Sequence, residues 1–204
     1  MTRESLNLIS ALLLAAGKGK RMKRVKQLLP LGERSMVEVS LKNLQSSRVD
    51  EIIIVLGFAA DRILPLVKGK EKVRPVINPC FREGMSTSIH HGLKAIHPQA
   101  KGIIIALADQ PFITSEIVNL LIERFSEGGK GIVVPVYQGR RGHPVIMDRE
   151  RYERELLGLR GDVGGKEIVE RHPEDVLAIE VSSSGIVVDI DDWEEYEKIQ
   201  GRVR

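Results

Sequence analysis

Glycines and cations alternate in one short segment near the N-terminus, from Leu14 to Pro30. Gly17 and Gly19 leave backbone N–H groups unshielded and permit a positive φ, so this segment can curl around phosphate oxygens. Arg21 and Lys26 bring cationic side chains to the same anion. The glycine spacing is neither that of a Walker loop nor that of a dinucleotide fingerprint. The segment therefore predicts a phosphate-binding loop, with a simple tight turn as the alternative.

Acidic residues follow two further apolar stretches. Asp109 comes directly after residues 102–107 (GIIIAL), where a carboxylate is well placed to hold a hard divalent cation such as Mg²⁺. Near the C-terminus, Asp189 and Asp191 alternate in an extended stretch, so both point to one side and either can supply a second carboxylate. The alternative is helix capping, by Asp109 for the helix that follows it and by Asp191 or Asp192 for the last helix.

Hydroxyl groups gather in a fourth segment, residues 78–92 (NPCFREGMSTSIHHG). Ser86 and Ser88 stand at an expected helix start, where an anion or a sugar hydroxyl can be received. The alternative for Ser86 is that it only caps the helix. The neighbouring His90 and His91 look like a metal-binding pair, but adjacent helical positions point about 100° apart. We therefore interpret them as histidines of a helix surface.

The elements that must position these segments alternate along the chain. Apolar runs that are too short for surface helices predict buried strands at residues 8–15, 51–56, 73–77 and 102–107. Helical spacing of apolar residues between these runs predicts helices over residues 37–44, 86–95 and 115–127. This alternation predicts an α/β fold, with a Rossmann-like mixed, mainly parallel sheet flanked by helices. Ligands bind beyond the carboxyl ends of such strands, where the four segments stand.

The second half of the chain continues the pattern. A fifth strand is expected at residues 131–137, and the turn at residues 138–142 predicts an antiparallel excursion into residues 144–147. The remaining expected elements are helices over residues 149–157 and 164–171, short strands around residues 176–179 and 186–190, and a closing helix from Trp193. No linker or repeat interrupts the sequence, so we expect a single domain over residues 1–204.

The composition limits the class of protein. The chain has 204 residues, of which 42% are hydrophobic and 29% are charged, and this is typical of a globular protein. Its single cysteine, Cys80, excludes an internal disulfide, a zinc site built from cysteines and an iron–sulfur cluster. Such cysteine usage suits the reducing cytoplasm.

Charge and hydropathy argue against nucleic acid and membrane as partners. The net charge is only +3, and the basic run at residues 18–26 contains no aromatic residue on which a base would stack. The apolar residues 8–16 are too few to span a membrane, and the basic residues after them are unfavourable for export. We expect a cytoplasmic protein that binds neither nucleic acid nor membrane.

Together, and in this order, the segments resemble one known family. Residues 14–30 meet the motif L-A-A-G-x-[GS]-x-R-M-G-x-x-K-x-L-L-P, except that Lys23 stands at the usual glycine. The chain resembles the MobA-like nucleotidyltransferases over nearly its whole length, and in particular their molybdenum cofactor cytidylyltransferase branch. Further matches are D-Q-P at residues 109–111, N…G-M-S-T-S…G-L within residues 78–93, R-G-H-P at residues 141–144, G-D-V-G at residues 161–164 and D-I-D at residues 189–191.

The resemblance implies a reaction and a set of nucleotide contacts. Enzymes of this family bind a Mg²⁺–nucleoside triphosphate, and a phosphate-type nucleophile attacks its α-phosphate with release of pyrophosphate. The nucleophile is already ionised, so positioning and charge neutralisation carry the catalysis. The positions of this sequence that match the nucleotide-binding motifs are Leu14, Ala15, Ala16, Gly17, Gly19, Ser86 and Ser88.

The resemblance also implies roles for charged residues. Arg21 would hold the triphosphate and Lys26 would stabilise the transferring phosphoryl group, so these two are the candidate catalytic residues. Asp109 would bind Mg²⁺, with either Asp189 or Asp191 as the second metal ligand. The sequence itself does not favour one of these two aspartates.

The resemblance implies the substrates less specifically than it implies the fold. The L-A-A-G form of the motif accompanies cytidylyl transfer, and the Cβ of Ala16 would narrow the base pocket toward the smaller pyrimidine ring, so we expect CTP. His143 and Asp162 would face the acceptor, which the resemblance identifies as the phosphate of molybdopterin, with a molybdoenzyme as the downstream recipient. The alternatives are guanylyl transfer from GTP, a sugar-phosphate acceptor, and a nucleotide-binding regulator without turnover.

Overall fold

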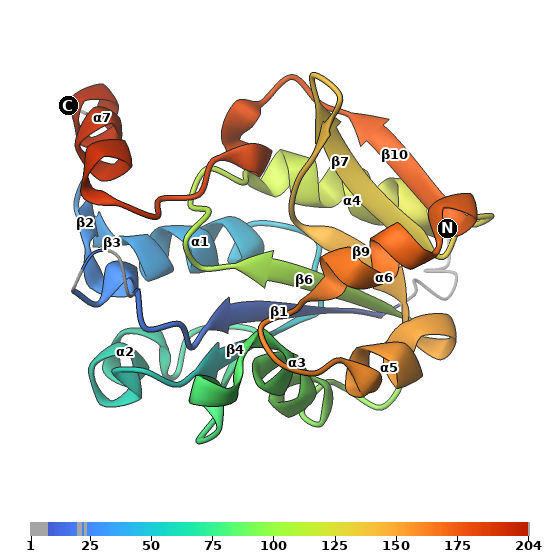
Figure 1. The fold of residues 1–204 in the computed structure, drawn as a ribbon, viewed down its shortest axis with the longest axis horizontal. Coiled ribbons are helices and arrows are strands. Elements are labelled where there is room, and N and C mark those ends of the chain that lie inside the picture. The colour runs from blue at the N-terminus through green and yellow to red at the C-terminus, as the bar shows by residue number, and fades with distance from the viewer. Residues whose placement is uncertain (1–7, 20–21, 23, 204) are drawn as a thin grey trace.

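The computed structural model describes residues 8–19, 22 and 24–203, and within this part of the chain eight strands form one mixed sheet. The strand order is β10–β7–β9–β6–β1–β4–β5, with β8 paired to β7 (Figure 1). The strands are β1 (Ile9–Ala15), β4 (Glu51–Leu56), β5 (Val73–Ile77), β6 (Gly102–Leu107), β7 (Ile132–Tyr137), β8 (Arg140–Arg141), β9 (Val145–Asp148) and β10 (Val176–Glu180).

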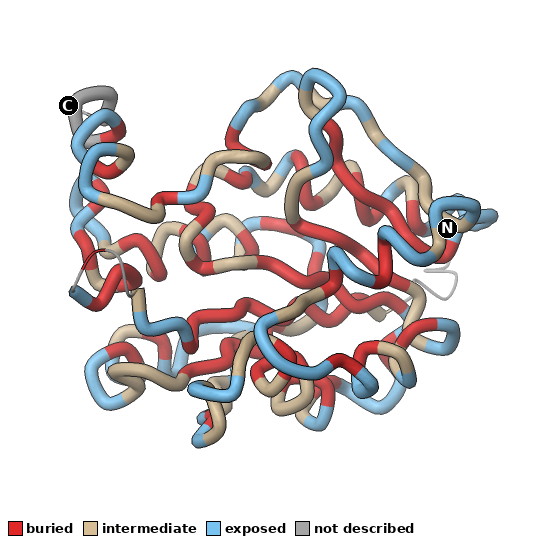
Figure 2. The backbone as a smooth tube through the Cα atoms, viewed as in Figure 1, coloured by how far each residue is buried: buried red, intermediate tan, exposed pale blue. Residues whose placement is uncertain are grey.

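Strand β1 lies at the centre of the parallel part of the sheet. It pairs in parallel with β4 on one side and with β6 on the other, so that Leu12 lies opposite both Ile53 and Ile105. Strand β9 is antiparallel to both of its neighbours, β6 and β7, as the turn at residues 138–142 predicted. All residues of β1 are buried, because helices cover both faces of the sheet (Figure 2). The predicted α/β class with a mainly parallel sheet is confirmed.

The helices form two layers. One core cluster packs the side chains of Ala11 and Leu13 against α1 (Met36–Gln45), α2 (Ala60–Val67) and α4 (Ser115–Ser126). The opposite face of the same strand packs Leu12 and Leu14 against α3 (Met85–Leu93), α5 (Arg149–Gly158) and α6 (Gly165–Arg171). This alternation follows from the period of two along a strand, which sends successive side chains to opposite faces.

The C-terminal helix belongs to neither layer. Helix α7 (Trp193–Val203) packs its Tyr196 and Ile199 against Met22 and against the hairpin of β2 (Pro30–Leu31) and β3 (Arg34–Ser35). The hydroxyl of Tyr196 donates to the carbonyl of Pro30 at 2.6 Å. The end of the chain therefore covers the segment that follows β1.

Short 3-10 turns complete the path at Lys26–Leu28, Phe81–Glu83, Pro173–Asp175 and Ser184–Val187. The strand expected at residues 186–190 is wrong, because the backbone there bonds to loops. The carbonyl of Ile186 accepts from the His143 amide at 3.0 Å, and the amide of Ile190 donates to the carbonyl of Asp109 at 3.2 Å.

The predicted helix cap at Ser86 is also wrong. Helix α3 begins at Met85, and its N-cap is Gly84 with a φ of 116°. A Cβ on Gly84 would lie 2.2 Å from the backbone of Gly161, so only glycine fits here. The Ser86 amide donates to the carbonyl of Gly161 at 3.2 Å.

The helices contain no candidate membrane span among the described residues, since none of them is both long and apolar enough to cross a bilayer.

Candidate active site

A cavity of about 690 Å³ opens beyond the carboxyl ends of β1 and β6. Its walls come from the segments that follow these two strands, from the start of α3 and from the chain before α7. Most of the predicted site residues line it: Leu14, Ala16, Gly17, Gly19, Lys26, Ser88, Asp109, Asp162 and Asp191. The position agrees with the rule that ligands bind at the carboxyl ends of parallel strands.

Lys26 forms the charged centre of this cavity. Its Nζ donates to Asp109 Oδ2 at 2.7 Å and to Asp191 Oδ1 at 2.6 Å, and its side chain is 8% exposed. Burial alone would lower the pKa of Lys26, but the charges and hydrogen bonds of the two aspartates outweigh it and hold the pKa above its ordinary value. The ammonium group is therefore charged at neutral pH. We call these three residues the lysine centre.

The local backbone explains why Lys26 points inward. Gly19 has a φ of 59°, and a Cβ there would lie 3.0 Å from the carbonyl oxygen of Arg24, so the loop can close only with glycine. Lys26 and Gln27 then begin a 3-10 turn, and both are buried. The side-chain amide of Gln27 donates to the carbonyl of Gly17 at 2.8 Å and ties the turn to the end of β1.

Three oxygen acceptors around this centre lack hydrogen-bond partners among the described residues. They are Oδ1 of Asp109, Oε1 of Gln27 and Oε1 of Gln110, and all three are buried. Buried acceptors without donors suit a hard cation, which prefers carboxylate and amide oxygens. The fit to Mg²⁺ is therefore good at Asp109, and Asp191 brings a second carboxylate to the same cavity. The part of the chain described here holds no cluster of three or more acidic, histidine or cysteine ligands.

The structure separates Asp189 from Asp191. Asp189 Oδ1 accepts from Gln110 Nε2 at 2.6 Å, and His143 Nδ1 lies 3.4 Å from the same nitrogen. Neither Asp189 nor His143 lines the cavity of the lysine centre. Asp191 is thus the aspartate that meets Lys26, a choice that the sequence left open. We call Gln110, Asp189 and His143 the glutamine centre.

Burial dominates the electrostatics of the glutamine centre. It raises the pKa of Asp189 against the opposing hydrogen bond from Gln110, and the charges of Asp109 and Asp191 add to the rise. Burial also lowers the pKa of His143, against the attraction of Asp189 and Asp109. Both shifts favour uncharged groups, since desolvation penalises charge. This contrasts with the lysine centre, where opposite charges stand in contact.

The capping alternatives can now be decided. Helix α4 begins at Ser115 with Thr114 as its N-cap, so Asp109 does not cap it. Asp192 caps α7, because the Glu195 amide donates to Asp192 Oδ1 at 2.9 Å. The Asp191 amide donates in turn to Glu195 Oε2 at 2.8 Å, which anchors the backbone next to the lysine centre.

The start of α3 sends its two predicted serines to different places. Ser88 lines the cavity and accepts from Asn78 Nδ2 at 3.0 Å. Ser86 lines another cavity on the far side of the turn, so its predicted nucleotide contact does not fall in this site. Asp162 reaches the site as predicted, and its Oδ1 accepts from the Met85 amide at 3.2 Å.

Two predicted residues need separate mention. Arg21 lies outside the described residues. Ala15 contributes only backbone to the end of β1, because its side chain belongs to the core cluster on the α1, α2 and α4 face.

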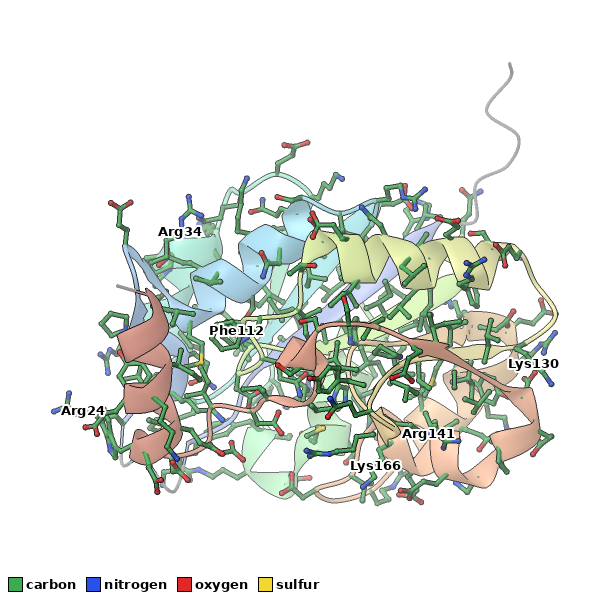
Figure 3. The ribbon with its side chains drawn as sticks, turned by 90° about the horizontal axis from the view of Figure 1, so that it is seen from above. Arg24, Arg34, Phe112, Lys130, Arg141 and Lys166 are labelled. Atoms are coloured by element: carbon green, nitrogen blue, oxygen red, sulfur yellow. The ribbon has the colours of Figure 1, made fainter. Side chains whose placement is uncertain are left out.

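Sequence reasoning missed Gln27, Arg82 and Met85, which line the cavity. It also missed that Trp193 holds the segment that follows β1. The indole Nε1 of Trp193 donates to the carbonyl of Met22 at 3.2 Å, and the Arg24 guanidinium lies 5.4 Å from the indole ring centroid. Figure 3 shows Arg24 beside α7. Gln27 stands next to Lys26 in the motif, but an uncharged amide gave no signal of its own. Gln27 bonds to Gly17 and Trp193 bonds to Met22, so both side chains stabilise the segment that follows β1 without being charged themselves.

The comparisons with known proteins agree with this geometry. Residues 11–176 match the MobA-like NTP transferase domain. The chain belongs to this family. The matched residues include the glycine loop, Lys26 and Asp109. The match ends before the segment that carries Asp191. Membership in this family supports a nucleotidyltransferase activity for the chain.

Relatives within the family differ in their named activities. The chain is 30% identical over 193 residues to the nicotine blue oxidoreductase of Paenarthrobacter nicotinovorans, covering 92% of this chain and 94% of the relative. It is 24% identical over 144 residues to the molybdenum cofactor cytidylyltransferase of Escherichia coli K12, covering 71% and 72%. The specific substrate therefore does not follow from similarity alone.

A solved structure shares the fold over almost the whole chain. The Rv0371C complex with manganese from Mycobacterium tuberculosis H37Rv superposes with a TM-score of 0.76 at 25% identity, covering 97% of this chain and 100% of that one. This agreement supports the layered arrangement described above.

Proposed function

We propose that this protein transfers CMP from CTP to the phosphate of molybdopterin, with Mg²⁺ as cofactor and pyrophosphate as the second product. The observation that carries the proposal is the buried Lys26 between Asp109 and Asp191, in a cavity walled by the glycine loop. A phosphate oxygen of the acceptor attacks the α-phosphorus, and the bond from that phosphorus to the bridging β-phosphate oxygen breaks. Because the nucleophile is already an anion, the site needs no strong general base.

The residues of the lysine centre divide the work. Lys26 stabilises the charge that builds on the transferring phosphoryl group, since a preformed ammonium in a water-poor site costs no reorganisation. Asp109 and Asp191 would hold Mg²⁺ together with triphosphate oxygens, and the bound ion supplies further neutralisation of charge. Arg21 and the backbone from Gly17 to Gly19 would bind the triphosphate.

The choice of CTP as the nucleotide is supported by residues that line the cavity near the end of β1. Ala16 lines the cavity, and we expect its Cβ to leave less room for a purine than for a pyrimidine. Ser88 lines the same cavity, with its hydroxyl already oriented by Asn78, and offers one polar contact for the nucleoside. These features favour CTP over GTP.

The acceptor would enter from the side of Asp162, which lines the cavity next to the start of α3. His143 contacts Gln110 outside this cavity, so its expected role toward the acceptor is not part of the proposal. A molybdoenzyme that takes up the nucleotide form of the cofactor is the proposed downstream recipient.

The first test is a thermal-shift titration with Mg²⁺ and each of CTP, GTP, ATP and UTP. A ligand that binds only the folded state stabilises it by about 2.7 kcal/mol at a hundred times its Kd. We expect the melting temperature to rise with Mg²⁺–CTP more than with the other nucleotides. Pyrophosphate release with molybdopterin as the acceptor then tests the transfer itself.

Controls make the titration decisive. Lys26→Ala should abolish most of the CTP shift, whereas Lys42→Ala, which removes one exposed lysine on α1, should leave it unchanged. An equal or larger shift with GTP would move the proposal to guanylyl transfer. Because one relative is named an oxidoreductase, NADH and NADPH are titrated as well. A shift with these two dinucleotides and none with CTP would overturn the transferase proposal.

A further inference from the structure

A second cavity, of about 400 Å³, lies on the other side of the α3 start from the active site. It opens between α3 and the end of α5, two helices that lie side by side (Figure 1). Ser86, His90 and Lys94 come from α3 and the residue after it, and Arg160 comes from the segment after α5. Helix α3 supplies one side of the lining, and the end of α5 with the segment after it supplies the other.

The chemistry of this cavity is cationic. Lys94 and Arg160 are exposed, and within the described residues neither forms an ion pair. Arg160 Nη1 donates only to the carbonyls of Leu157 and Leu159, at 2.9 and 2.7 Å, which holds the guanidinium at the rim. Glu83 is the one carboxylate in the lining. Two unpaired cations beside a hollow attract an anion.

The inner wall adds polar groups that are ready to bind. Ser86 is 1% exposed and lines the cavity from inside. Nε2 of His90 is buried and, among the described residues, has no hydrogen-bond partner. A buried polar atom without a partner is unfavourable, and a bound ligand would remove that cost.

We propose that this cavity is a second anion site, which takes a phosphate group between Lys94 and Arg160 with His90 and Ser86 at its base. Arginine and lysine together supply the charged donors that phosphate oxygens accept from. The volume admits orthophosphate or pyrophosphate. The site stands apart from the lysine centre and does not depend on the proposed function.

The two cavities share a wall, so the anion site is placed to act on the active site. Gly161 follows Arg160 and packs against Gly84, while the next residue, Asp162, bonds to the Met85 amide in the active-site cavity. An anion that joins Arg160 to Lys94 would fix the segment after α5 against α3. This would hold Asp162 in its place on the wall of the active-site cavity.

The test follows the imidazole signals of His90 by NMR while orthophosphate is added, with His90→Gln used for assignment. The variants are Lys94→Ala/Arg160→Ala, which removes both cations, and Lys42→Ala/Arg154→Ala, which removes the same charge from exposed positions elsewhere. Lys26→Ala disables the lysine centre. We expect phosphate to shift His90 with the same Kd in the wild type, the Lys42/Arg154 variant and the Lys26 variant.

In the Lys94/Arg160 variant we expect the Kd for orthophosphate to rise about tenfold or more. If that variant does not fold, Lys94→Ala alone gives the same comparison, because Lys94 is exposed. A second arm replaces orthophosphate with pyrophosphate: tighter binding there assigns the site to that diphosphate, and equal binding assigns it to free phosphate. An unmoved His90, an unchanged Kd without the two cations, or loss of the shift in Lys26→Ala would overturn the proposal.

Discussion

Two polar centres lie side by side in this protein, and each takes one residue from the segment after β6 and one from the segment before α7. The lysine centre contains Asp109 and Asp191. The glutamine centre contains Gln110, which follows Asp109 directly, and Asp189, which stands two positions before Asp191. The first balances charge around a buried ammonium and faces a cavity. Among the described residues, the second has no lysine or arginine in its hydrogen bonds, and it stands outside that cavity.

The difference teaches that neighbouring residues of one motif can have separate tasks. The charged groups of an ion pair that faces a cavity can bind a charged substrate or a metal ion in place of each other. Such a pair can therefore take part in binding and turnover. Side chains that are tied to one another by hydrogen bonds mainly fix geometry. We therefore expect substitutions in the lysine centre to change turnover and metal dependence, and substitutions in the glutamine centre to change stability.

The largest effect is expected from Lys26→Ala. Loss of one charged contact to the transition state lowers kcat by about 10²-fold or more. Pyrophosphate release at saturating nucleotide measures this, with Lys42→Ala as the control for loss of a lysine. Turnover near that of the wild type would mean that Lys26 is only a structural partner of the two aspartates.

Next come Asp109→Asn and Asp191→Asn. Each removes a charged oxygen ligand while keeping the size of the side chain, so the Mg²⁺ concentration needed for nucleotide binding should rise about tenfold or more, equivalent to about 1.4 kcal/mol. The measurement is a Mg²⁺ titration at fixed CTP, followed by thermal shift. If only one of the two variants responds, the metal is held by that aspartate alone.

Gln110→Glu tests whether the glutamine centre needs an uncharged hydrogen-bond donor beside Asp189. It places a second carboxylate against Asp189 without a cation, which should lower the free energy of unfolding by about 1–3 kcal/mol at pH 7. The pair would bind a proton more readily in the folded state, so the lost stability should return as the pH falls. Urea unfolding at pH 7 and pH 5 measures both, with the exposed Gln99→Glu as control. Equal losses in both variants would contradict a repulsion between Asp189 and the new carboxylate.

The smallest effect is expected from Asp189→Asn. The asparagine oxygen still accepts from Gln110, and no metal ligand is lost, so the Mg²⁺ requirement should change by less than about threefold, under about 0.7 kcal/mol. The same Mg²⁺ titration as for Asp191→Asn gives the comparison directly. A change as large as that of Asp191→Asn would show that Asp189 also holds the metal, and the two centres would then be one.

Much of this arrangement was predictable because it depends on local patterns. Continuous apolar runs such as residues 51–56 are buried on both faces, so their type and parallel setting follow from the sequence. Gly17, Gly19 and Lys26 were predicted to meet a ligand, and they line one cavity. The predicted strand at residues 186–190 failed because alternation alone does not supply a pairing partner.

The sequence by itself determined the α/β class, the carboxyl-end position of the site and the glycine loop, because strand period, helix period and backbone freedom are properties of neighbouring residues. Only the tertiary structure decided that Asp191 and not Asp189 meets Lys26, across 165 positions of sequence. It also decided that Ser88 and not Ser86 faces the active site. Such choices depend on where a side chain finds a partner of opposite charge or a free cavity, and that partner comes from a distant element.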